Sequence, residues 1–297
     1  MKRVLISAIN YRCSKEAIDL IKSLKNLNYN TIDILILDNS ENDDYQPIKK
    51  AFPKIKLLIN KNIGVSGGIN QALDYAEKNK FDYLLMLDAD VELDPNCLKE
   101  MINVALENHG AAIIGAKSYY FNEKNILQDI ARKYNPYKGS LVREIGGIED
   151  KGQFETVKEV SYVWGGCLLF DIKKMKNVGR LDERYFLFYD TMDIQIRAQN
   201  LGYKVFYAPK AKLWHKVSRS QSSNNYFDYY SIRNRLLLVK KFNTPVQKFI
   251  FYIYFLFLAL PFKTIKNLIE KKTSTIKWNF KGLFDAFLGR WGRKIIP

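Results

Sequence analysis

Two carboxylates separated by one small residue follow directly on a short apolar run, and their chemistry is the clearest in the sequence. The run covers residues 83–87 and has a length typical of a strand buried on both faces; Asp88 and Asp90 come next. In an extended chain these side chains point to one side, with Ala89 between them. Paired carboxylates repel each other unless a cation lies between them, and Mg²⁺ or Mn²⁺ prefers such oxygen ligands. An isolated Asp-x-Asp also occurs in solvated loops, so the rest of the chain must decide.

Further polar side chains follow the other strands expected in the first half. Apolar runs at residues 4–9, 32–37 and 55–60 predict strands, and helical spacing predicts helices over residues 15–27 and about 68–78. Strands alternating with helices indicate an α/β fold, a mostly parallel sheet with helices on both faces. Ligands of such sheets bind beyond the C-terminal ends of the strands, where Asn10 and Asp38 fall together with Asp88 and Asp90. This convergence favours one site.

A glycine-rich stretch at residues 64–70 precedes the second predicted helix and contains Gly64, Gly68 and Asn70. It lacks the Gly-Lys-Ser/Thr ending of a Walker loop and does not fit Gly-x-Gly-x-x-Gly. Glycines before a helix let the backbone approach a ligand, and a helix N-terminus favours anionic groups. A tight strand-to-helix turn explains the same residues without a ligand, so both interpretations stay open.

The second half carries three more groups of candidate residues. We assign residues 117–160 only to connecting structure that could line an acceptor groove. Residues 160–170 predict a strand interrupted by Gly165 and Gly166, a pattern typical of a bulge or of close approach by a ligand. Asp190 is placed to cap a helix, one turn from Asp193 on the same face. His215 is one of only two histidines, and a lone histidine is more often structural than a ligand.

Taken in order, these motifs resemble family 2 glycosyltransferases, especially the bacterial rhamnosyltransferase-like branch that builds surface polysaccharides. The resemblance covers about residues 3–240 and rests on eight motifs in matching order and spacing. It implies a GT-A fold, inversion at the anomeric carbon, a nucleotide-diphospho-sugar donor (a dTDP- or UDP-sugar) and a divalent cation, Mg²⁺ or Mn²⁺. The motifs are Asn10-Tyr11, Asp38-Asn39-Ser40, Asn62-x-Gly64-x-x-Gly67-Gly68-x-Asn70, Asp88-Ala89-Asp90, Gly165-Gly166, Gly179-x-Leu181-Asp182-Glu183, the acidic cluster from Asp190, and Trp214-His215.

The resemblance also implies roles for individual residues. Asp38 would contact the base or ribose of the donor, and Asp88 would lie beside the ribose and the cation. Asp90 would bind the cation, and His215 would contact the metal or the diphosphate. The remaining expected contacts are Asn10, Gly64, Gly68 and Asn70 on the donor side and Trp164, Gly165 and Gly166 beside the sugar and acceptor.

The sequence departs from the family at the catalytic base. The family usually reads Glu-Asp in the acidic cluster, where an ungapped match places Asp190 and Thr191. Threonine cannot act as a base near neutral pH, so either a neighbouring carboxylate takes this role or the acceptor hydroxyl ionises unusually easily. We expect Asp190 to be the base, with Asp193 as the alternative.

The net charge of +16 is concentrated at the C-terminal end. Residues 1–209 hold 29 Lys and Arg against 28 Asp and Glu, whereas residues 210–297 hold 18 against 3. We therefore expect a transferase domain at 1–240 and a basic, aromatic helical tail at 241–297. The tail's run of twelve apolar residues, 249–260, ends before Pro261; a helix of about 18 Å is too short to span hydrocarbon of about 30 Å. It predicts a helix lying on an anionic membrane, with packing on the transferase domain as the alternative.

Composition and N-terminus bear on the compartment and on competing functions. Three widely spaced cysteines and an N-terminus without a signal-peptide pattern indicate a cytoplasmic enzyme, here peripheral on the inner face of the cell membrane. The expected acceptor is a growing, lipid-linked surface glycan, the sugar could be rhamnose, and a homodimer is allowed. One alternative is a sugar nucleotidyltransferase, but the sequence lacks the basic glycine-rich loop that such enzymes carry after the first strand. The other is a nucleic-acid-binding protein, but the basic tail lacks a recognisable groove-reading motif, so no nucleic acid is expected as a partner.

Overall fold

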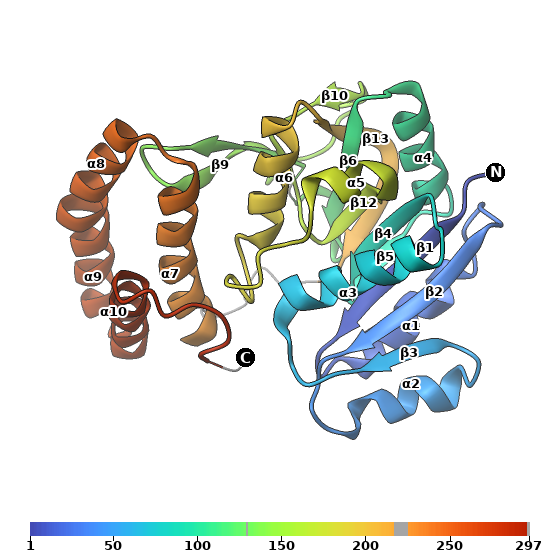
Figure 1. Cartoon of the computed structure of the whole chain (residues 1–297), viewed down its shortest axis with the longest axis horizontal. Coiled ribbons are helices and arrows are strands. Elements are labelled where there is room, and N and C mark those ends of the chain that lie inside the picture. Colours follow the sequence, from blue (N-terminus) through green and yellow to red (C-terminus); the bar gives the residue numbers. More distant parts are fainter. Residues whose placement is uncertain (129, 217–224, 296–297) are drawn as a thin grey trace.

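The computed structural model describes residues 1–128, 130–216 and 225–295 (Figure 1). Within them, the main sheet has ten strands and follows the order β10-β13-β6-β12-β4-β1-β2-β3, with β5 paired to β13 and β7 to β6. The strands are β1 (Val4–Asn10), β2 (Ile32–Asp38), β3 (Lys56–Ile59), β4 (Tyr83–Asp88), β5 (Val91–Leu93), β6 (Ala111–Tyr120), β7 (Glu123–Leu127), β10 (Lys158–Glu159), β12 (Cys167–Asp171) and β13 (Lys204–His215).

The sheet is parallel in its N-terminal half, as predicted, and mixed beyond it. β1 pairs in parallel with β2 and β4, whereas β12 inserts antiparallel between β4 and β6. The register sets Asn10 beside Asp38 and Ile9 beside Asp88, so the ends of β1, β2 and β4 lie together at one edge of the sheet. This is the edge at which ligands of α/β sheets bind.

Helices cover both faces because the central strands are apolar on both sides. Leu5 and Leu84 pack under α3, α5 and α6, whereas Ile6 and Leu85 pack under α1, α2 and α4. These helices are α1 (Ser14–Leu24), α2 (Gln46–Ala51), α3 (Gly64–Lys78), α4 (Cys97–Glu107), α5 (Ile172–Val178) and α6 (Asp190–Asn200); a short 3₁₀ turn, η1 (Asp43–Tyr45), precedes α2.

Residues 117–160 are more regular than the sequence indicated. They contain the end of β6, β7, and a hairpin of β8 (Ala131–Asn135) and β9 (Ser140–Ile145), to which β11 (Tyr162–Val163) adds a third strand. The repeated apolar spacing that marks the central strands is weak here because β9 is largely exposed. The segment is therefore a small antiparallel sheet and not merely connecting structure.

The C-terminal part of the described chain, from Asn225 onward, is mostly helical. It consists of α7 (Asn225–Phe242), α8 (Pro245–Tyr254), the π-helical turn η2 (Phe255–Ala259), α9 (Leu260–Ile269) and α10 (Thr273–Phe287). In Figure 1 these helices form one end of the molecule, with α7 nearer the sheet and α8 and α9 outside. Pro261 does not end the helix as predicted, because the wider π turn precedes it and the chain stays helical over Pro245–Ile269.

Candidate active site

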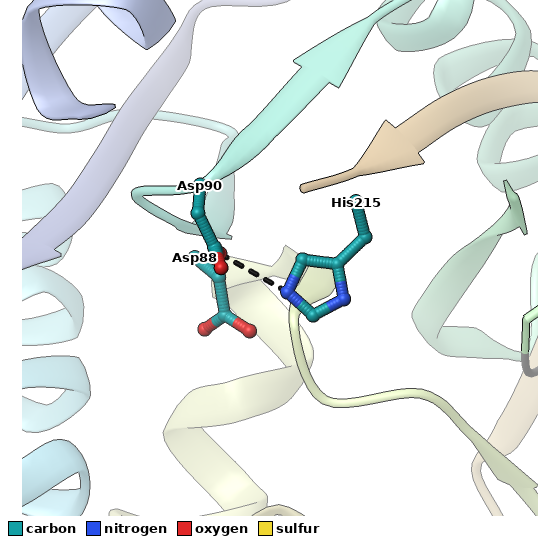
Figure 2. A group of neighbouring side chains, drawn as sticks. All are labelled: Asp88, Asp90 and His215. Atoms are coloured by element: carbon teal, nitrogen blue, oxygen red, sulfur yellow. Dashed lines mark hydrogen bonds and ion pairs between the residues drawn. The ribbon is translucent and has the colours of Figure 1, made fainter. Parts of the chain in front are cut away.

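A cluster of two carboxylates and one imidazole lies where β4, β5 and β13 meet. Asp88 ends β4, Asp90 follows in the turn before β5, and His215 is the last residue of β13, opposite Val91 of β5. His215 Nε2 lies 3.1 Å from Asp90 Oδ1 (Figure 2), and ligand atoms of all three residues lie within 4.8 Å of one another. This donor set and spacing fit a divalent cation.

The electrostatics of the cluster also fit a cation. The protein around Asp88 desolvates its carboxylate and raises its pKa to about 6, and the charge of Asp90 adds to this shift. The side chain nevertheless has surface that is open to the cleft. Burial lowers the pKa of His215, but the hydrogen bond and charge of Asp90 outweigh it, so the net shift is upward. The Gln128 side chain lies 2.8 Å from the other ring nitrogen, Nδ1, and orients the imidazole. A bound divalent cation would favour the deprotonated forms of both groups.

The Gly165-Gly166 pair lies between β11 and β12 and leaves room for the site's own side chains. A Cβ on Gly166 would lie 2.4 Å from Asp88 Oδ2, and one on Gly165 would lie 2.7 Å from the hydroxyl oxygen of Thr191. The Trp164 ring lies beside the His215 ring, with centroids 4.7 Å apart. The close approach expected at these glycines therefore involves Asp88 and Thr191 of the protein itself.

Asp38 is fully buried at the end of β2, and only one of its oxygens has a hydrogen-bond partner among the described residues. Oδ1 accepts hydrogen bonds from Asn10 Nδ2 at 2.6 Å and Ser40 Oγ at 2.8 Å, whereas Oδ2 has none. Such a buried acceptor is costly unless something donates to it. An N–H or O–H of a nucleoside fits this requirement, and Asn10 serves to orient the carboxylate.

The glycine-rich stretch forms the first turns of α3 and not a loop before the helix. Gly64 has φ +75° and a Cβ there would lie 2.3 Å from the Phe186 carbonyl oxygen, which accepts a hydrogen bond from Val65 N. A Cβ on Gly68 would collide with Ile9 at 2.6 Å. The Asn70 amide bonds with both backbone groups of Leu181, so this side chain is committed within the protein.

Asp190 and Asp193 differ in their surroundings although they are one helical turn apart. Asp190, the first residue of α6, accepts a hydrogen bond from Ser66 Oγ at 3.0 Å. Burial raises its pKa to about 6, against the lowering effect of hydrogen bonds from Thr191 N and Ser66. Asp193 is fully buried and pairs with Arg197 Nε at 2.7 Å and with Lys241.

Two cavities meet at Asp88, Val65 and Gly165. One, of about 660 Å³, contains Asp90, and the other, of about 450 Å³, contains Asp190. We call them the donor-side and acceptor-side cavities. The donor-side cavity is further lined by Ile9, Tyr11, Cys13, Glu16, Lys216 and Tyr226, and the acceptor-side cavity by Ser140, Leu141, Tyr162, Trp164, Tyr189 and Phe227.

Sequence reasoning missed two side chains of the site. Lys216 lines the donor-side cavity, and Ser66 holds Asp190 from a helix 124 residues earlier in the chain. The position of Lys216 directly after His215 was a usable signal, because a cation next to metal ligands suits a diphosphate. The contact between Ser66 and Asp190 depends on tertiary structure and leaves no local signal.

A curled mixed α/β sheet with an acidic cluster at its strand ends is the arrangement expected of a GT-A-type sugar transferase. The chain belongs to glycosyl transferase family 2, whose profile matches residues 4–179. It is a glycosyltransferase of glycan or polysaccharide biosynthesis. This membership decides against both the nucleotidyltransferase and the nucleic-acid-binding alternatives.

Relatives of known activity match over most of the chain. The low-salt glycan biosynthesis hexosyltransferase Agl10 of Haloferax volcanii is 22% identical over 97% of this chain and 92% of its own. The N-acetylglucosaminyl-diphospho-decaprenol L-rhamnosyltransferase of Mycobacterium tuberculosis is 20% identical over 72% and 76%. The dTDP-rhamnosyl transferase RfbF of Shigella flexneri is 23% identical over 80% and 81%.

Solved structures share the fold at low sequence identity. Staphylococcus aureus TarS 1-349 superposes with a TM-score of 0.56 at 15% identity, over 96% of this chain and 80% of its own. GalNAc-T7, solved with UDP, GalNAc and Mn²⁺, gives a TM-score of 0.68 at 14% identity, over 98% and 58%. The predicted GT-A fold is thereby confirmed.

Proposed function

We propose that this protein is an inverting glycosyltransferase that moves a sugar from a nucleotide-diphosphate donor to a hydroxyl of a lipid-linked glycan. The observation that carries the proposal is the meeting of the two cavities at Asp88. One cavity is lined by Asp88 and Asp90 of the carboxylate–imidazole cluster, and the other is lined by Asp190, an acid with a raised pKa. Inversion needs a base on the face of the sugar opposite the leaving diphosphate, and we assign this role to Asp190.

The donor binds in the donor-side cavity. Asp88, Asp90 and His215 would hold Mg²⁺ or Mn²⁺, which neutralises the charge of the diphosphate leaving group. Lys216 adds a positive charge to the same cavity. Asp38 recognises the nucleoside through its unpartnered Oδ2, while Asn10 orients it. Gly64 and Gly68 let α3 approach the donor side closely, and Asn70 fixes α3 to the segment around Leu181.

The acceptor hydroxyl lies in the acceptor-side cavity, and Asp190 is its base. Trp164, Gly165 and Gly166 border this cavity together with Asp190. Ser66 orients the Asp190 carboxylate through a hydrogen bond. Burial raises the pKa of Asp190 to about 6, which suits a base working at neutral pH. Asp193 is a weaker candidate because both its oxygens bind cationic side chains.

The relatives support a deoxyhexose donor and a lipid-linked acceptor. One is named a dTDP-rhamnosyl transferase, and another acts on a diphospho-decaprenol substrate according to its name. On this basis we assign dTDP-rhamnose or a UDP-sugar as donor and place the protein on the cytoplasmic face of the cell membrane. The transferase domain would comprise residues 1–240, and residues 241–297 would be its membrane-associating part.

A donor screen tests the proposal. The purified chain is incubated with dTDP-, UDP- and GDP-sugars in Mn²⁺ or Mg²⁺, and release of nucleoside diphosphate is measured. One donor should be hydrolysed far faster than the others, and the anomeric configuration of a transfer product should be inverted. A retained configuration, or cleavage between the two phosphates, would contradict the assigned reaction.

A further inference from the structure

An extended row of exposed apolar side chains runs along the outside of the C-terminal helices. Phe257 and Phe262 are each 73% exposed, and Ile269 is 77% exposed. Contiguous exposed apolar surface of this kind marks an interaction site in soluble proteins. We call it the outer apolar face; it consists of Val246, Phe249, Ile250, Ile253, Phe257, Leu258, Phe262, Ile265, Leu268 and Ile269 of Pro245–Ile269, and Phe280, Phe284, Phe287 and Leu288 at α10.

The opposite side of the same helix is committed to the protein. Phe251 and Phe255 are buried against Leu236 and Val239 of α7 and against Ala286 of α10. Lys263 on this inner side donates a hydrogen bond to Asn279 of α10 at 3.1 Å. Packing against the protein, the alternative expected from the sequence, therefore occurs on one side of the helix. The outer apolar face has no partner among the described residues.

We infer that the outer apolar face docks this enzyme on an anionic membrane, with the helix Pro245–Ile269 lying in the plane of the interface. The inference deepens the proposed function, because it states how a lipid-linked acceptor reaches the site. Residues 210–297 carry 18 basic and 3 acidic residues, and Lys266, Lys277 and Lys281 are exposed on the same helices. A second copy would bring the same positive charge, whereas anionic headgroups neutralise it.

Length and composition alone would also let Pro245–Ile269 cross a bilayer, since its most apolar window has a mean hydropathy of 1.6. Crossing would carry the helices packed on its inner side into hydrocarbon. α7 contributes Arg233 and Arg235, and the inner side of α9 contributes Lys263 and Asn267, all costly at that depth. An in-plane helix keeps these groups on the protein side and immerses only the outer apolar face.

The docking helix also contacts the hairpin that lines the acceptor-side cavity. The wall of this cavity includes Leu141 of β9, in that hairpin, and Phe227 of α7. A Cβ on Gly139 would lie 2.6 Å from Val239 and 2.7 Å from Phe251. The helix that presents the outer apolar face thus also supports the hairpin that lines this cavity.

Flotation of the full chain tests the docking surface. Vesicles of phosphatidylcholine, with or without phosphatidylglycerol, are mixed with wild type, with Phe257→Ser/Phe262→Ser, or with the control Leu106→Ser/Leu201→Ser, whose side chains are 46% and 56% exposed elsewhere. The Phe pair should lower partitioning onto anionic vesicles by at least about tenfold, and the control should not. Turnover on a soluble acceptor should stay unchanged in both.

Two further measurements separate the competing occupants. Lys240→Cys, near the end of α7, and Lys272→Cys, after α9, flank the helix Pro245–Ile269. Each variant, in a Cys13→Ser background, should react with an impermeant maleimide added outside vesicles. Protection of one end would show that the helix crosses and overturn the in-plane inference. If the wild-type chain does not float, or if Phe257→Ser/Phe262→Ser floats as well as wild type, the docking inference is wrong. If the wild type is a dimer and Phe257→Ser/Phe262→Ser is a monomer, a second copy covers the outer apolar face. A failed transfer assay would not affect these readouts.

Discussion

Asp190 and Asp193 show how environment gives two like side chains different chemistry. Asp193 faces Arg197, Lys241 and Tyr185, so its charge is neutralised within the fold. Among the described residues, Asp190 accepts hydrogen bonds from neutral donors, Ser66 Oγ and the backbone N–H groups of Asp190 and Thr191, and burial raises its pKa to about 6. An acid held this way binds and releases a proton near neutral pH, whereas an ion-paired one serves stability.

Substituting each acid should separate these roles. Asp190→Asn should lower kcat by about 10²–10⁴ while donor affinity and thermal stability stay close to wild type. Asp193→Asn should mainly lower the melting temperature, because it leaves the partly buried Lys241 and Arg197 without full charge compensation. Steady-state kinetics and thermal unfolding of both variants decide this. Near-normal turnover in Asp190→Asn with lost turnover in folded Asp193→Asn would reverse the assignment.

The same carboxylate predicts a pH dependence. Asp190 acts as a base only when ionised, and its pKa is raised to about 6, so the protonated, inactive form dominates below that pH. With donor and cation saturating, kcat should fall about tenfold per pH unit below 6 and level off above it. The pH profile of kcat should show this inflection, while Asp182→Asn, outside both cavities, serves as control. A flat profile between about pH 5 and 7 would count against Asp190.

Cation binding provides a third prediction at single residues. Asp90→Asn should weaken Mn²⁺ binding strongly, because it removes a ligand and the partner of His215 Nε2. Titration of the chain with Mn²⁺, followed by electron paramagnetic resonance of the free ion, measures this directly, and Asp94→Asn is the matched control in the next turn. Full transfer activity in excess EDTA would contradict the requirement for a cation.

The sequence indicates which candidate residues lie at strand ends, but it does not indicate which side chains they contact. Asp38 and Asp88 stand out because each ends an apolar run, and Asp90 follows Asp88 by two residues; the sheet brings such strand ends together. Asn70 and Asp193 fit motifs equally well, yet tertiary contacts to Leu181 and Lys241 commit them to the fold. Local patterns do not encode such contacts.

At the scale of elements, α7 organises the loop that carries Asp190. Phe186, Phe188 and Tyr189 all have positive φ, at 65°, 64° and 67°, an unfavourable backbone for bulky residues. Asn234 of α7 donates hydrogen bonds to the Leu187 and Phe188 carbonyl oxygens at 2.7 and 3.1 Å. α7 is thus part of the site's scaffold.

Asn234→Ala should therefore act through the loop. Losing these hydrogen bonds costs about 1–3 kcal/mol and lets the loop relax, which moves Asp190 away from Ser66. We expect kcat to fall at least about tenfold with donor affinity retained. Asn279→Ala, which removes another buried tail amide remote from the loop, should lower stability alone. Equal kinetic effects of the two substitutions would argue for general destabilisation.

Elements with strong apolar periodicity were predictable, and those shaped by long-range contacts were not. Strands β1, β2 and β4 follow from their buried runs. α3 begins at Gly64, earlier than predicted, because Phe186 from a distant loop caps its first turn. Pro261 reads as a helix end in the sequence, but the preceding π turn accommodates it.

At the scale of the whole molecule, the C-terminal segment returns to the opposite end of the site. Arg293 binds both carboxylate oxygens of Glu41, at 2.8 and 2.7 Å, and the carbonyl oxygen of Asn62 at 3.1 Å. Glu41 follows Asp38 by three residues and Asn62 precedes α3, so the guanidinium joins two loops at the donor edge. Tyr230 accepts hydrogen bonds from Lys294 N and Ile295 N and fixes this segment.

Arg293→Ala should weaken donor binding more than it slows turnover. Arg293 holds the Glu41 loop through a bidentate ion pair and the Asn62 loop through a hydrogen bond. Releasing both loops should raise the donor KM about five- to tenfold with a smaller change in kcat. Arg290→Ala is the matched control, because its side chain is 57% exposed and lies 3.6 Å from Asp285, away from the donor edge. Exchanging the charges in Glu41→Arg/Arg293→Glu should recover part of the lost affinity, which a merely destabilised tail would not do. An unchanged donor KM in Arg293→Ala would show that the C-terminal segment has no part in donor binding.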